Sequence, residues 1–279
     1  MHGKTCLITG ANAGIGKETA AGLAARGARV LMVCRDSGRG EAAVRELRSR
    51  VPGADLELIQ ADLSTIAAVR ALVPEVADRT SRLDVLVSNA GVFHARRTTT
   101  PDGLETTFAV NHLAPFVLVN GLLDMLRASR PARVVIVASD AHFKGTIRFD
   151  DLQAERRYGG WRAYTQSKLA NVLYARKLAG HMSANEVTVN SLHPGAVGTK
   201  LLLRGIIPPR LARPWTITPE QGAQTPIFLA SSDDVAGVSG RYFHECRVKE
   251  PSEEARNAEV AARLWDVSSR IVEEKTGDA

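Results

Sequence analysis

Short apolar segments alternate with longer amphipathic segments along this chain of 279 residues. Each apolar segment spans three to five residues and is rich in β-branched side chains, which is typical of strands buried on both faces of a sheet. The amphipathic segments repeat apolar residues every three or four positions, as helices do. The six strands expected from this pattern are residues 5–9, 29–33, 56–59, 85–87, 134–137 and 187–190.

Strands separated by helices predict a mostly parallel sheet with helices on both faces. Because the crossovers between parallel strands are right-handed, we expect an α/β fold of the doubly wound Rossmann type, with six to seven strands. No linker-like segment divides the chain, so one domain is expected over residues 1–279. The least regular segment, at about 198–219, holds four prolines and is predicted to be a substrate flap.

Composition and charge argue against several other classes of protein. No apolar run approaches the ~20 residues of a membrane helix, and the first strand begins too early for a signal peptide or a membrane anchor. Cys6, Cys34 and Cys246 are far apart and odd in number, which supports neither a disulfide framework nor a metal site. The net charge of +6 comes from scattered arginines, so no nucleic-acid partner is predicted. We expect a cytoplasmic protein.

The segment 9–16, TGANAGIG, joins the first expected strand to the first expected helix. Its glycines are spaced Gly-x3-Gly-x-Gly, which differs from the commoner Gly-x-Gly-x2-Gly fingerprint of dinucleotide sites. In this setting bare backbone allows a pyrophosphate to come close, and the helix N-terminus offers free amides and a positive dipole end. A tight turn that binds no ligand is the alternative.

Two other strand ends carry candidate residues of a nucleotide cleft. Asp62 follows the third strand, where its carboxylate could meet an adenine or cap the next helix. The small residues 88–91, SNAG, end the fourth strand and leave space for a flat ring system beside the backbone. A simple turn would account for the second segment equally well.

Tyr164 and Lys168 are four residues apart in a segment with helical periodicity, so both side chains would point into one cleft. A phenol with an ordinary pKa of ~10 becomes easier to ionise beside a fixed ammonium, and we therefore expect a lowered pKa for Tyr164. Such a tyrosine can donate a proton to a carbonyl oxygen or remove one from an alcohol. A surface tyrosine with an unrelated, solvated lysine is the alternative.

Ser139 and Asn111 are the other candidate polar residues. Ser139 ends the fifth strand, at the edge where ligands of doubly wound folds bind, and it could hold a substrate oxygen or cap a turn. Asn111 lies inside an expected helix, where it could bind water and bend the helix or face solvent. The sequence ASDAH lacks the Gly-x-Ser-x-Gly elbow, which argues against a Ser-His-Asp hydrolase.

Together these motifs resemble the short-chain dehydrogenase/reductase superfamily, and the resemblance covers nearly the full length of the chain. TGANAGIG, SNAG, Asn111, Ser139, Tyr164-x3-Lys168 and His193-Pro194-Gly195 follow one another in the order of that superfamily. The resemblance implies a catalytic tetrad of Asn111, Ser139, Tyr164 and Lys168. Tyr164 would be the acid/base and Ser139 would position the carbonyl. Lys168 would also hold the nicotinamide ribose, and Asn111 would hold a water of a proton relay.

The motifs and the family resemblance together predict which residues would contact the cofactor. Asp62 and Leu63 would meet the adenine, and Pro194 and Gly195 the nicotinamide carboxamide. The full set is Gly10, Asn12, Ala13, Gly14, Ile15, Gly16, Arg35, Asp62, Leu63, Asn89, Ala90, Gly91, Tyr164, Lys168, Pro194, Gly195, Val197 and Thr199.

A narrower likeness links the chain to the retinol-dehydrogenase-like branch. It is carried by ITGANAGIGKETA, CRD at 34–36, NHLAPF, SDAHFKG, YTQSKLANVLYARKLA, PEQGAQT and SGRYFHEC. The chain departs from the family pattern at Ser88, where Asn is usual, and at Ala138, where a second serine is common. Many branch members carry an N-terminal membrane anchor that this sequence does not show, so we expect a soluble, bacterial-type member rather than a retinoid enzyme.

The end of the second expected strand indicates which nicotinamide cofactor is bound. An acidic residue there favours NAD, whereas arginine accommodates a 2′-phosphate. Cys34 occupies the acidic position and Arg35 follows it, so NADP(H) is preferred and NAD(H) is possible. Lys17 could add positive charge, and an inward-facing Asp36 would weaken the preference.

The expected enzyme is an NADP(H)-dependent short-chain dehydrogenase/reductase, a ketoreductase-like protein that acts on a hydrophobic ketone, aldehyde or alcohol. This substrate class rests on the apolar residues of the flap and on Phe143; His142, Trp161 and Trp265 are expected to be structural. The alternatives are a catalytically silent nucleotide sensor or scaffold, and a non-redox reaction on the same fold.

The resemblance also implies a homodimer or homotetramer whose subunits contact one another through the helices containing Asn111 and Tyr164. The flap residues are Leu201, Leu202, Leu203, Ile206, Ile207 and Trp215.

Overall fold

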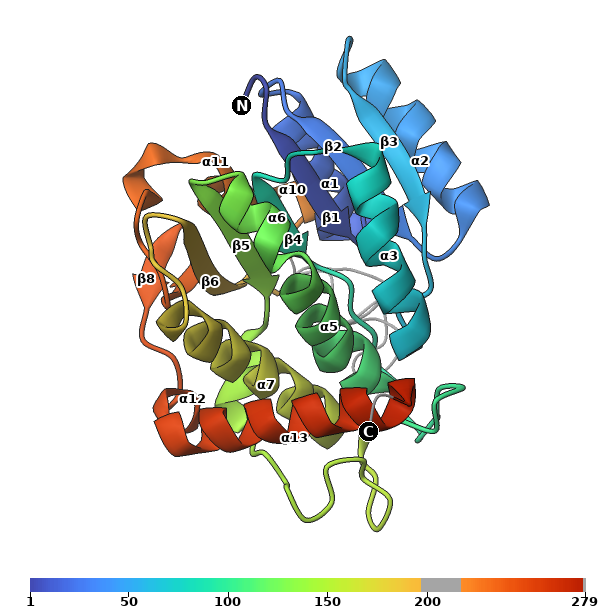
Figure 1. Cartoon of the computed structure of the whole chain (residues 1–279), viewed down its shortest axis with the longest axis vertical. Coiled ribbons are helices and arrows are strands. Elements are labelled where there is room, and N and C mark those ends of the chain that lie inside the picture. Colours follow the sequence, from blue (N-terminus) through green and yellow to red (C-terminus); the bar gives the residue numbers. More distant parts are fainter. Residues whose placement is uncertain (197–216, 278–279) are drawn as a thin grey trace.

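The computed structural model describes residues 1–196 and 217–277, and eight strands in this part of the chain form one sheet (Figure 1). The strand order is β3-β2-β1-β4-β5-β6-β7-β8, and all neighbours are parallel except β7 and β8. This confirms the predicted α/β doubly wound fold, but the sheet has eight strands and not the predicted six to seven, because two short strands, β7 and β8, join the six expected from the sequence. The strands are β1 Thr5–Thr9, β2 Arg29–Cys34, β3 Leu56–Gln60, β4 Val85–Ser88, β5 Ala132–Val137, β6 Val187–His193, β7 Tyr242–His244 and β8 Arg247–Lys249.

The strand order reverses at β1, and this reversal locates the ligand crevice. β1 pairs with β2 on one side, Thr5 opposite Arg29, and with β4 on the other, Cys6 opposite Val85. The chain that leaves β1 turns away from the chain that leaves β4, so a crevice opens beyond their carboxyl ends. Both TGANAGIG and SNAG therefore lie at this edge of the sheet.

Helices cover both faces of the sheet because successive strand residues point to opposite sides. Leu7 and Leu86 pack in the core beneath α3, α5 and α7, whereas Ile8 and Val87 pack in a second core beneath α1, α2 and α11. The helices are α1 Gly14–Ala24, α2 Ser37–Arg50, α3 Ile66–Arg79, α4 Thr106–Phe108, α5 Ala114–Gly121, α6 Leu123–Ala128, α7 Gly160–Gly180, α10 Pro219–Gly222, α11 Gln224–Ser231, α12 Glu253–Arg256 and α13 Ala258–Thr276. A π-helix, η1 Ala109–Leu113, and two 3₁₀ turns, η2 Asp140–Lys144 and η4 Asp233–Val235, complete the described elements.

The C-terminal helix α13 has one apolar stripe and packs across the helical layer. The Asn257 side chain caps its first turn by accepting from the amides of Glu259 and Val260. The buried residues recur at three- and four-residue spacing, which directs one face of the helix toward the core. They are Ala261, Leu264, Ser268 and Val272.

In Figure 1, α13 (red) runs across the lower ends of α5 and α7. The Trp265 ring lies 5.1 Å from the Phe116 ring on α5 and 5.8 Å from the Tyr174 ring on α7. The Ser268 hydroxyl pairs with His112 Nε2 at 2.9 Å. The packing role expected for Trp265 is therefore confirmed. The same helix covers part of the surface that the resemblance implied for subunit contact, and the homodimer or homotetramer stays a prediction.

The flap prediction falls mostly outside the described residues. Residues 198–216, with the apolar side chains assigned to the flap, are among those that the structure does not describe. Just after this segment, the Ile217 amide donates to the Ala196 carbonyl at 3.0 Å, and Thr218 caps α10 through a capping box with Gln221. The assignment of residues 1–279 to one domain also stays a prediction. None of the described helices is both long and apolar enough to cross a membrane.

Asp84 joins the starts of the two central strands. Its carboxylate accepts hydrogen bonds from the Thr5 amide at 3.0 Å, Lys4 Nζ at 2.9 Å and Arg82 Nε at 2.8 Å. Burial alone would raise the pKa of this carboxyl, but the hydrogen bonds outweigh it and hold the pKa below its ordinary value. The ionised form therefore stabilises the fold.

We expect Asp84→Asn to lower the free energy of unfolding at pH 7 by about 2 kcal/mol, because charge-assisted hydrogen bonds to a buried group are lost. The folded pKa is depressed, so this stabilisation is complete above the unfolded pKa of about 4 and disappears as the pH falls through the folded value. Urea unfolding followed by circular dichroism at pH 7 and at about pH 2 measures both effects, because the stabilisation from the ionised carboxylate is lost only well below pH 4. Asp124→Asn, at a side chain that is 98% exposed, is the control and should change little. An equal loss at both pH values would contradict this account.

Candidate active site

The turn between β1 and α1 lies directly against the segment that follows β4. Gly10 has a φ of +66°, and a Cβ atom there would lie 2.9 Å from the Ala90 Cα. A Cβ atom on Gly16 would overlap the Asn89 side-chain amide and the Gly10 carbonyl. Glycine is therefore required at both positions, and the backbone of the turn is left bare.

The N-terminus of α1 is open to an anion. Its N-cap residue, Ala13, has no side-chain acceptor, and the first turn contains no acidic residue. The amides of Gly14, Ile15 and Gly16 precede the first helical hydrogen bond, which the Lys17 amide donates to the Ala13 carbonyl. Free amides at the positive end of a helix dipole suit a phosphate.

Thr9 and Asn89 fix this turn, and the sequence analysis missed Thr9. Asn89 Nδ2 donates to the carbonyls of Thr9 at 2.9 Å and Gly10 at 3.2 Å. The Thr9 hydroxyl accepts the amides of Asn89 and Ala90, both at 3.0 Å. A polar residue in the last position of a buried strand was the available signal, because such a hydroxyl needs hydrogen-bond partners.

At the end of β2, Arg35 is exposed and the acidic residue beside it is engaged. Cys34 is buried, and its thiol donates to the Asp36 carbonyl at 3.2 Å. The Asp36 carboxylate caps α2 by accepting the Arg39 amide at 2.9 Å, and it lies 3.6 Å from Arg39 Nε. The inward-facing Asp36 considered above is therefore not seen. Within residues 1–196 and 217–277, the Arg35 guanidinium forms no ion pair.

Lys17 gives less support to the charge argument than expected. Its ammonium lies 2.6 Å from a Glu46 carboxylate oxygen on α2 and 3.8 Å from Glu18. Two acidic partners offset its charge near the start of α1. Arg35 is thus the better candidate for contact with a cofactor phosphate.

Asp62 does not cap the next helix. Its carboxylate accepts the Ser64 amide at 3.0 Å, whereas the Thr65 hydroxyl caps α3 by accepting the Ala68 amide. The capping alternative for Asp62 is therefore wrong. Asp62 is exposed beyond β3, and Leu63 beside it packs partly against the core.

Tyr164 and Lys168 share one face of α7, and Lys168 is 3% exposed. Lys168 Nζ donates to the Val137 carbonyl at 2.9 Å and lies 5.7 Å from the centre of the Tyr164 ring. Burial lowers the pKa of Lys168 to about 8. The alternative of a solvated lysine is therefore wrong.

The pKa of Tyr164 moves in the direction opposite to our expectation. Burial raises the pKa of Tyr164 to about 12, and hydrogen bonding with the Ser139 hydroxyl lowers it only in part. Removal of the phenol from water destabilises the phenolate, and this effect of burial is the largest cause of the raised pKa. At neutral pH the side chain is a protonated phenol, which can act as a proton donor.

Ser139 lies just after β5 and combines the two roles considered for it. Its hydroxyl oxygen accepts the Ala141 amide at 3.1 Å and so caps the η2 turn. The same hydroxyl interacts with the Tyr164 phenol. The structure thus brings Ser139, Tyr164 and Lys168 together at the carboxyl edge of the sheet.

Asn111 lies inside the π-helix η1 and is fully buried. Its Oδ1 accepts the Val92 amide at 2.7 Å, and its Nδ2 donates to the Val92 carbonyl and to the Ser167 hydroxyl, both at 3.0 Å. The solvent-facing alternative is therefore wrong. A Cβ atom on Gly91 would lie 3.4 Å from Asn111 Oδ1 and 3.6 Å from Lys168 Nζ, so Gly91 borders both side chains. π-helical turns often occur at functional sites.

The segment after β6 approaches the same edge. Pro194 follows the last residue of β6, and Gly195 has a φ of +90° with the Ile217 side chain against its α-carbon. Val197 and Thr199, the other two expected cofactor contacts of this segment, lie outside the described residues.

Two aromatic rings flank Tyr164. The Trp161 ring stacks at 6.0 Å from the Tyr164 ring, and the Phe93 ring meets it edge-on at 5.9 Å. Trp161 packs on Tyr164 on one side only, since 47% of it is exposed. Phe93 was missed; its place two residues after SNAG was the only signal.

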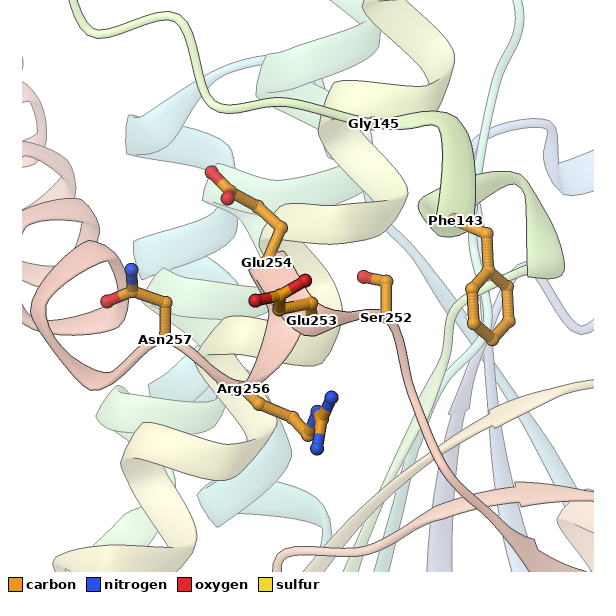
Figure 2. Close-up of a pocket in the computed structure, with 7 residues that line it drawn as sticks. All are labelled: Phe143, Gly145, Ser252, Glu253, Glu254, Arg256 and Asn257. Atoms are coloured by element: carbon orange, nitrogen blue, oxygen red, sulfur yellow. The ribbon is translucent and has the colours of Figure 1, made fainter.

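A separate hollow of about 670 Å³ lies between η2 and α12 (Figure 2). Its walls include Phe143 and Ser252 and contain none of the expected catalytic or cofactor-binding residues. Lys249 Nζ lies 5.2 Å from the centre of the Phe143 ring. We do not assign the substrate to this hollow, and Phe143 is a weaker candidate for substrate contact than Trp161.

Comparisons with known proteins agree with this geometry. Residues 4–204 match the short chain dehydrogenase family. Mouse retinol dehydrogenase 14 is 47% identical over an alignment that covers 98% of this chain and 86% of the relative, and mouse retinol dehydrogenase 12 is 42% identical over 98% and 87%. An uncharacterised protein from Mycobacterium paratuberculosis matches in structure with a TM-score of 0.79 and 32% identity, covering 98% of this chain and 94% of that one. The NADP complex of Pseudomonas aeruginosa RhlG matches with a TM-score of 0.71 and 29% identity, covering 87% and 94%. The chain therefore belongs to the short-chain dehydrogenase/reductase family of oxidoreductases, in its retinol-dehydrogenase-like branch.

Proposed function

We propose that this protein is an NADP(H)-dependent oxidoreductase that transfers hydride between nicotinamide and a hydrophobic ketone, aldehyde or alcohol. The observation that carries the proposal is the Tyr164 phenol, which interacts with the Ser139 hydroxyl and has a buried lysine 5.7 Å from its ring. In the proposed reaction Ser139 holds the substrate oxygen and Tyr164 exchanges a proton with it.

The bare turn at the start of α1 fits a dinucleotide. Gly10 and Gly16 admit no side chain, and the uncapped amides of α1 suit a pyrophosphate. We infer that Asn12 and Ala13 complete this cradle, that Asn89, Ala90 and Gly91 line the cleft, and that Asp62 and Leu63 face the adenine. Lys168 would hold the ribose next to the nicotinamide, with Pro194, Gly195, Val197 and Thr199 at the carboxamide. The bound cofactor would supply or accept the hydride.

The preference for NADP(H) rests on the end of β2. Arg35 is exposed there, and its guanidinium can form bidentate hydrogen bonds with a phosphate. The acidic residue nearest to it, Asp36, is engaged at the start of α2. A ribose 2′-hydroxyl would lack the carboxylate partner that NAD-specific sites provide.

The pKa values favour a role for Tyr164 as an acid at neutral pH. With a pKa of about 12, the phenol carries its proton to the reacting oxygen, which is the step that carbonyl reduction needs. Lys168, with a pKa of about 8, is mostly protonated at pH 7 and provides the nearby positive charge. We therefore propose that carbonyl reduction is the easier direction at neutral pH.

The relay role of Asn111 is a proposal with a defined geometry. Both protons of the Asn111 amide are used, one by Val92 and one by Ser167. A relay water would therefore donate to the second lone pair of Asn111 Oδ1. This position borders Gly91 and the Lys168 ammonium.

The hydrophobic substrate class is supported by the rings of Phe93 and Trp161. Both flank the Tyr164 ring, and the exposed part of Trp161 offers a flat apolar surface. The alternative function, a silent nucleotide sensor, has no need of a buried ammonium beside a desolvated phenol. The four intact residues of the expected tetrad therefore favour an enzyme.

We expect the purified protein to oxidise NADPH in the presence of ketones or aldehydes, with kcat/KM rising with the apolar size of the carbonyl. Tyr164→Phe should lower kcat by at least about a hundredfold, because the proton donor is lost, while NADPH affinity stays nearly constant. Tyr174→Phe, at a buried tyrosine whose hydroxyl has no hydrogen-bond partner in the described part of the chain, is the control. Full activity of Tyr164→Phe would refute the acid/base role. Tight NADPH binding with no turnover of any carbonyl would favour the sensor.

Arg35→Glu should raise the apparent KM for NADPH at least about tenfold, because a carboxylate replaces the cation that faces the 2′-phosphate. The kcat with saturating NADPH should change little, since Arg35 touches none of the reacting atoms. Arg45→Glu serves as the control, because it makes the same charge change at an exposed side chain of α2. Steady-state kinetics with NADPH and NADH measure the effect; a variant with an unaltered preference between the two would disprove the assignment.

Gly16→Ala should weaken NADPH binding at least about tenfold, because the added methyl group displaces the Asn89 amide and the Gly10 carbonyl from the turn. Gly180→Ala is the matched control, since a Cβ atom at that end of α7 meets nothing within 4 Å. Calorimetric titration with NADPH and thermal unfolding of both variants separate cofactor binding from stability. Wild-type affinity in Gly16→Ala would show that the cradle is not there.

A further inference from the structure

Two sequence motifs meet beside the active site, and apart from Ser139 none of their residues has a role in the chemistry above. SDAHFKG, residues 139–145, begins at Ser139 and forms the η2 turn, whereas SGRYFHEC, residues 239–246, contains β7. The Tyr242 hydroxyl of β7 donates to Asp140 Oδ1 at 2.7 Å. Lys249 Nζ of β8 donates to Asp140 Oδ2 at 2.9 Å. The residue that follows Ser139 is thus held by two strands that lie about a hundred residues further along the chain.

His142 holds the same turn from its other end. Its Nδ1 lies 2.7 Å from the Ser139 carbonyl oxygen, and its Nε2 lies 3.2 Å from the Ser252 amide. A backbone amide can only donate, so Nε2 accepts and the proton is on Nδ1, which donates to the Ser139 carbonyl. The ring is fully buried and meets the Tyr242 ring edge-on at 4.7 Å. Figure 2 shows Ser252, just before α12, beside the turn that carries Phe143.

Together these contacts leave the Ser139 backbone little freedom. The Ser139 carbonyl is fixed by His142, and the next side chain is fixed by Tyr242 and Lys249. The Ser139 hydroxyl also accepts the Ala141 amide, which limits its rotation. A side chain locked in this way keeps one orientation relative to Tyr164 without loss of conformational entropy when substrate binds.

We propose that Asp140, His142, Tyr242 and Lys249 are positioning residues, which hold the η2 turn so that the Ser139 hydroxyl faces the Tyr164 phenol. The proposal rests on the role assigned to Ser139 in the proposed function. It gives the C-terminal strands β7 and β8 and the start of α12 a part in catalysis, although none of their residues touches the reacting atoms.

The charges around Asp140 support this arrangement. Burial opposes ionisation of Asp140, but the hydrogen bonds from Lys249 and Tyr242 outweigh it and keep its pKa below the ordinary value. His193 Nε2 lies 3.6 Å from the same carboxylate, and its ring stacks on His244. Burial lowers the pKa of His193 to about 4, so His193 is neutral at pH 7 and Lys249 is the cation that faces Asp140.

A double-mutant cycle between Tyr242 and Ser139 tests the proposal, with NADPH and the best carbonyl substrate found. Tyr242→Phe should lower kcat about tenfold and leave the KM for NADPH within about twofold, because it misplaces the serine without altering the cofactor site. In a Ser139→Ala background the same substitution should have almost no effect on kcat, since the group that it positions is gone.

Three controls separate positioning from general destabilisation. Tyr174→Phe makes the same chemical change at a buried hydroxyl with no hydrogen-bond partner among the described residues and should leave kcat unchanged. Lys249→Arg should retain activity, because it keeps a donor for Asp140, whereas Lys249→Met should lose about as much kcat as Tyr242→Phe. Thermal unfolding of each variant shows that kcat is measured on folded protein.

The possible outcomes are distinct. An effect of Tyr242→Phe that is undiminished in the Ser139→Ala background would overturn the positioning role, as would a wild-type kcat for Tyr242→Phe. A wild-type kcat for Ser139→Ala would instead remove Ser139 from the proposed reaction, and the positioning role would fall with it. A loss of kcat that Tyr242→Phe causes in the wild-type background but not in the Ser139→Ala background supports both assignments.

Discussion

The hydrogen bond from the Lys168 ammonium to the Val137 carbonyl is the constraint on which the rest of the site depends. It joins the middle of α7 to the end of β5 at 2.9 Å, two residues before Ser139. Because Tyr164 lies one turn before Lys168 on the same helix face, this one contact brings the phenol to the serine. An ammonium that is 3% exposed is costly to bury, and the pKa of about 8 reflects that cost. Groups with such perturbed pKa values concentrate at functional sites, and here the perturbed lysine also fixes the geometry.

A second layer of contacts holds the helices that carry the site. Asn111, a buried residue of the π-helix η1, joins the segment after β4 to α7 through Val92 and Ser167. Its neighbour His112 pairs with Ser268 on α13. Burial lowers the pKa of His112 to about 3, so this pairing involves a neutral imidazole at all ordinary pH values. The C-terminal helix is thereby part of the same scaffold, and so are β7 and β8 through Asp140.

The sequence predicted the fold well because short apolar, β-branched runs and helical periodicity are local signals. β7 (YFH) and β8 (RVK) have only three residues each and lack the apolar, β-branched run that marked the equally short segment 85–87. Their places in the sheet depend on the pairing of β7 with β6 and of β8 with β7. The motif residues were correctly grouped at one edge, since parallel strands share their carboxyl ends. Thr9 and Phe93 were missed because their roles depend on partners that lie far away in the sequence or on another element. The exposure of Trp161 was missed for the same reason.

The direction in which the pKa of Tyr164 shifts could not be predicted from an i, i+4 pair, because the burial of a side chain depends on distant parts of the chain. The burial of this phenol also matters for the proposed reaction. The low dielectric that raises the pKa of the isolated phenol also strengthens the attraction between a phenolate and the Lys168 ammonium. The Lys168 ammonium lies 5.7 Å from the centre of the Tyr164 ring, which is close enough for such an attraction to act. The attraction appears only as the proton leaves Tyr164, so it would stabilise the state after proton transfer and not the resting enzyme. Catalysis requires this kind of difference between transition state and ground state. A tyrosine that is a neutral phenol at rest, beside a cation that is already fixed in place, meets that requirement better than a phenolate that is ionised before the substrate arrives.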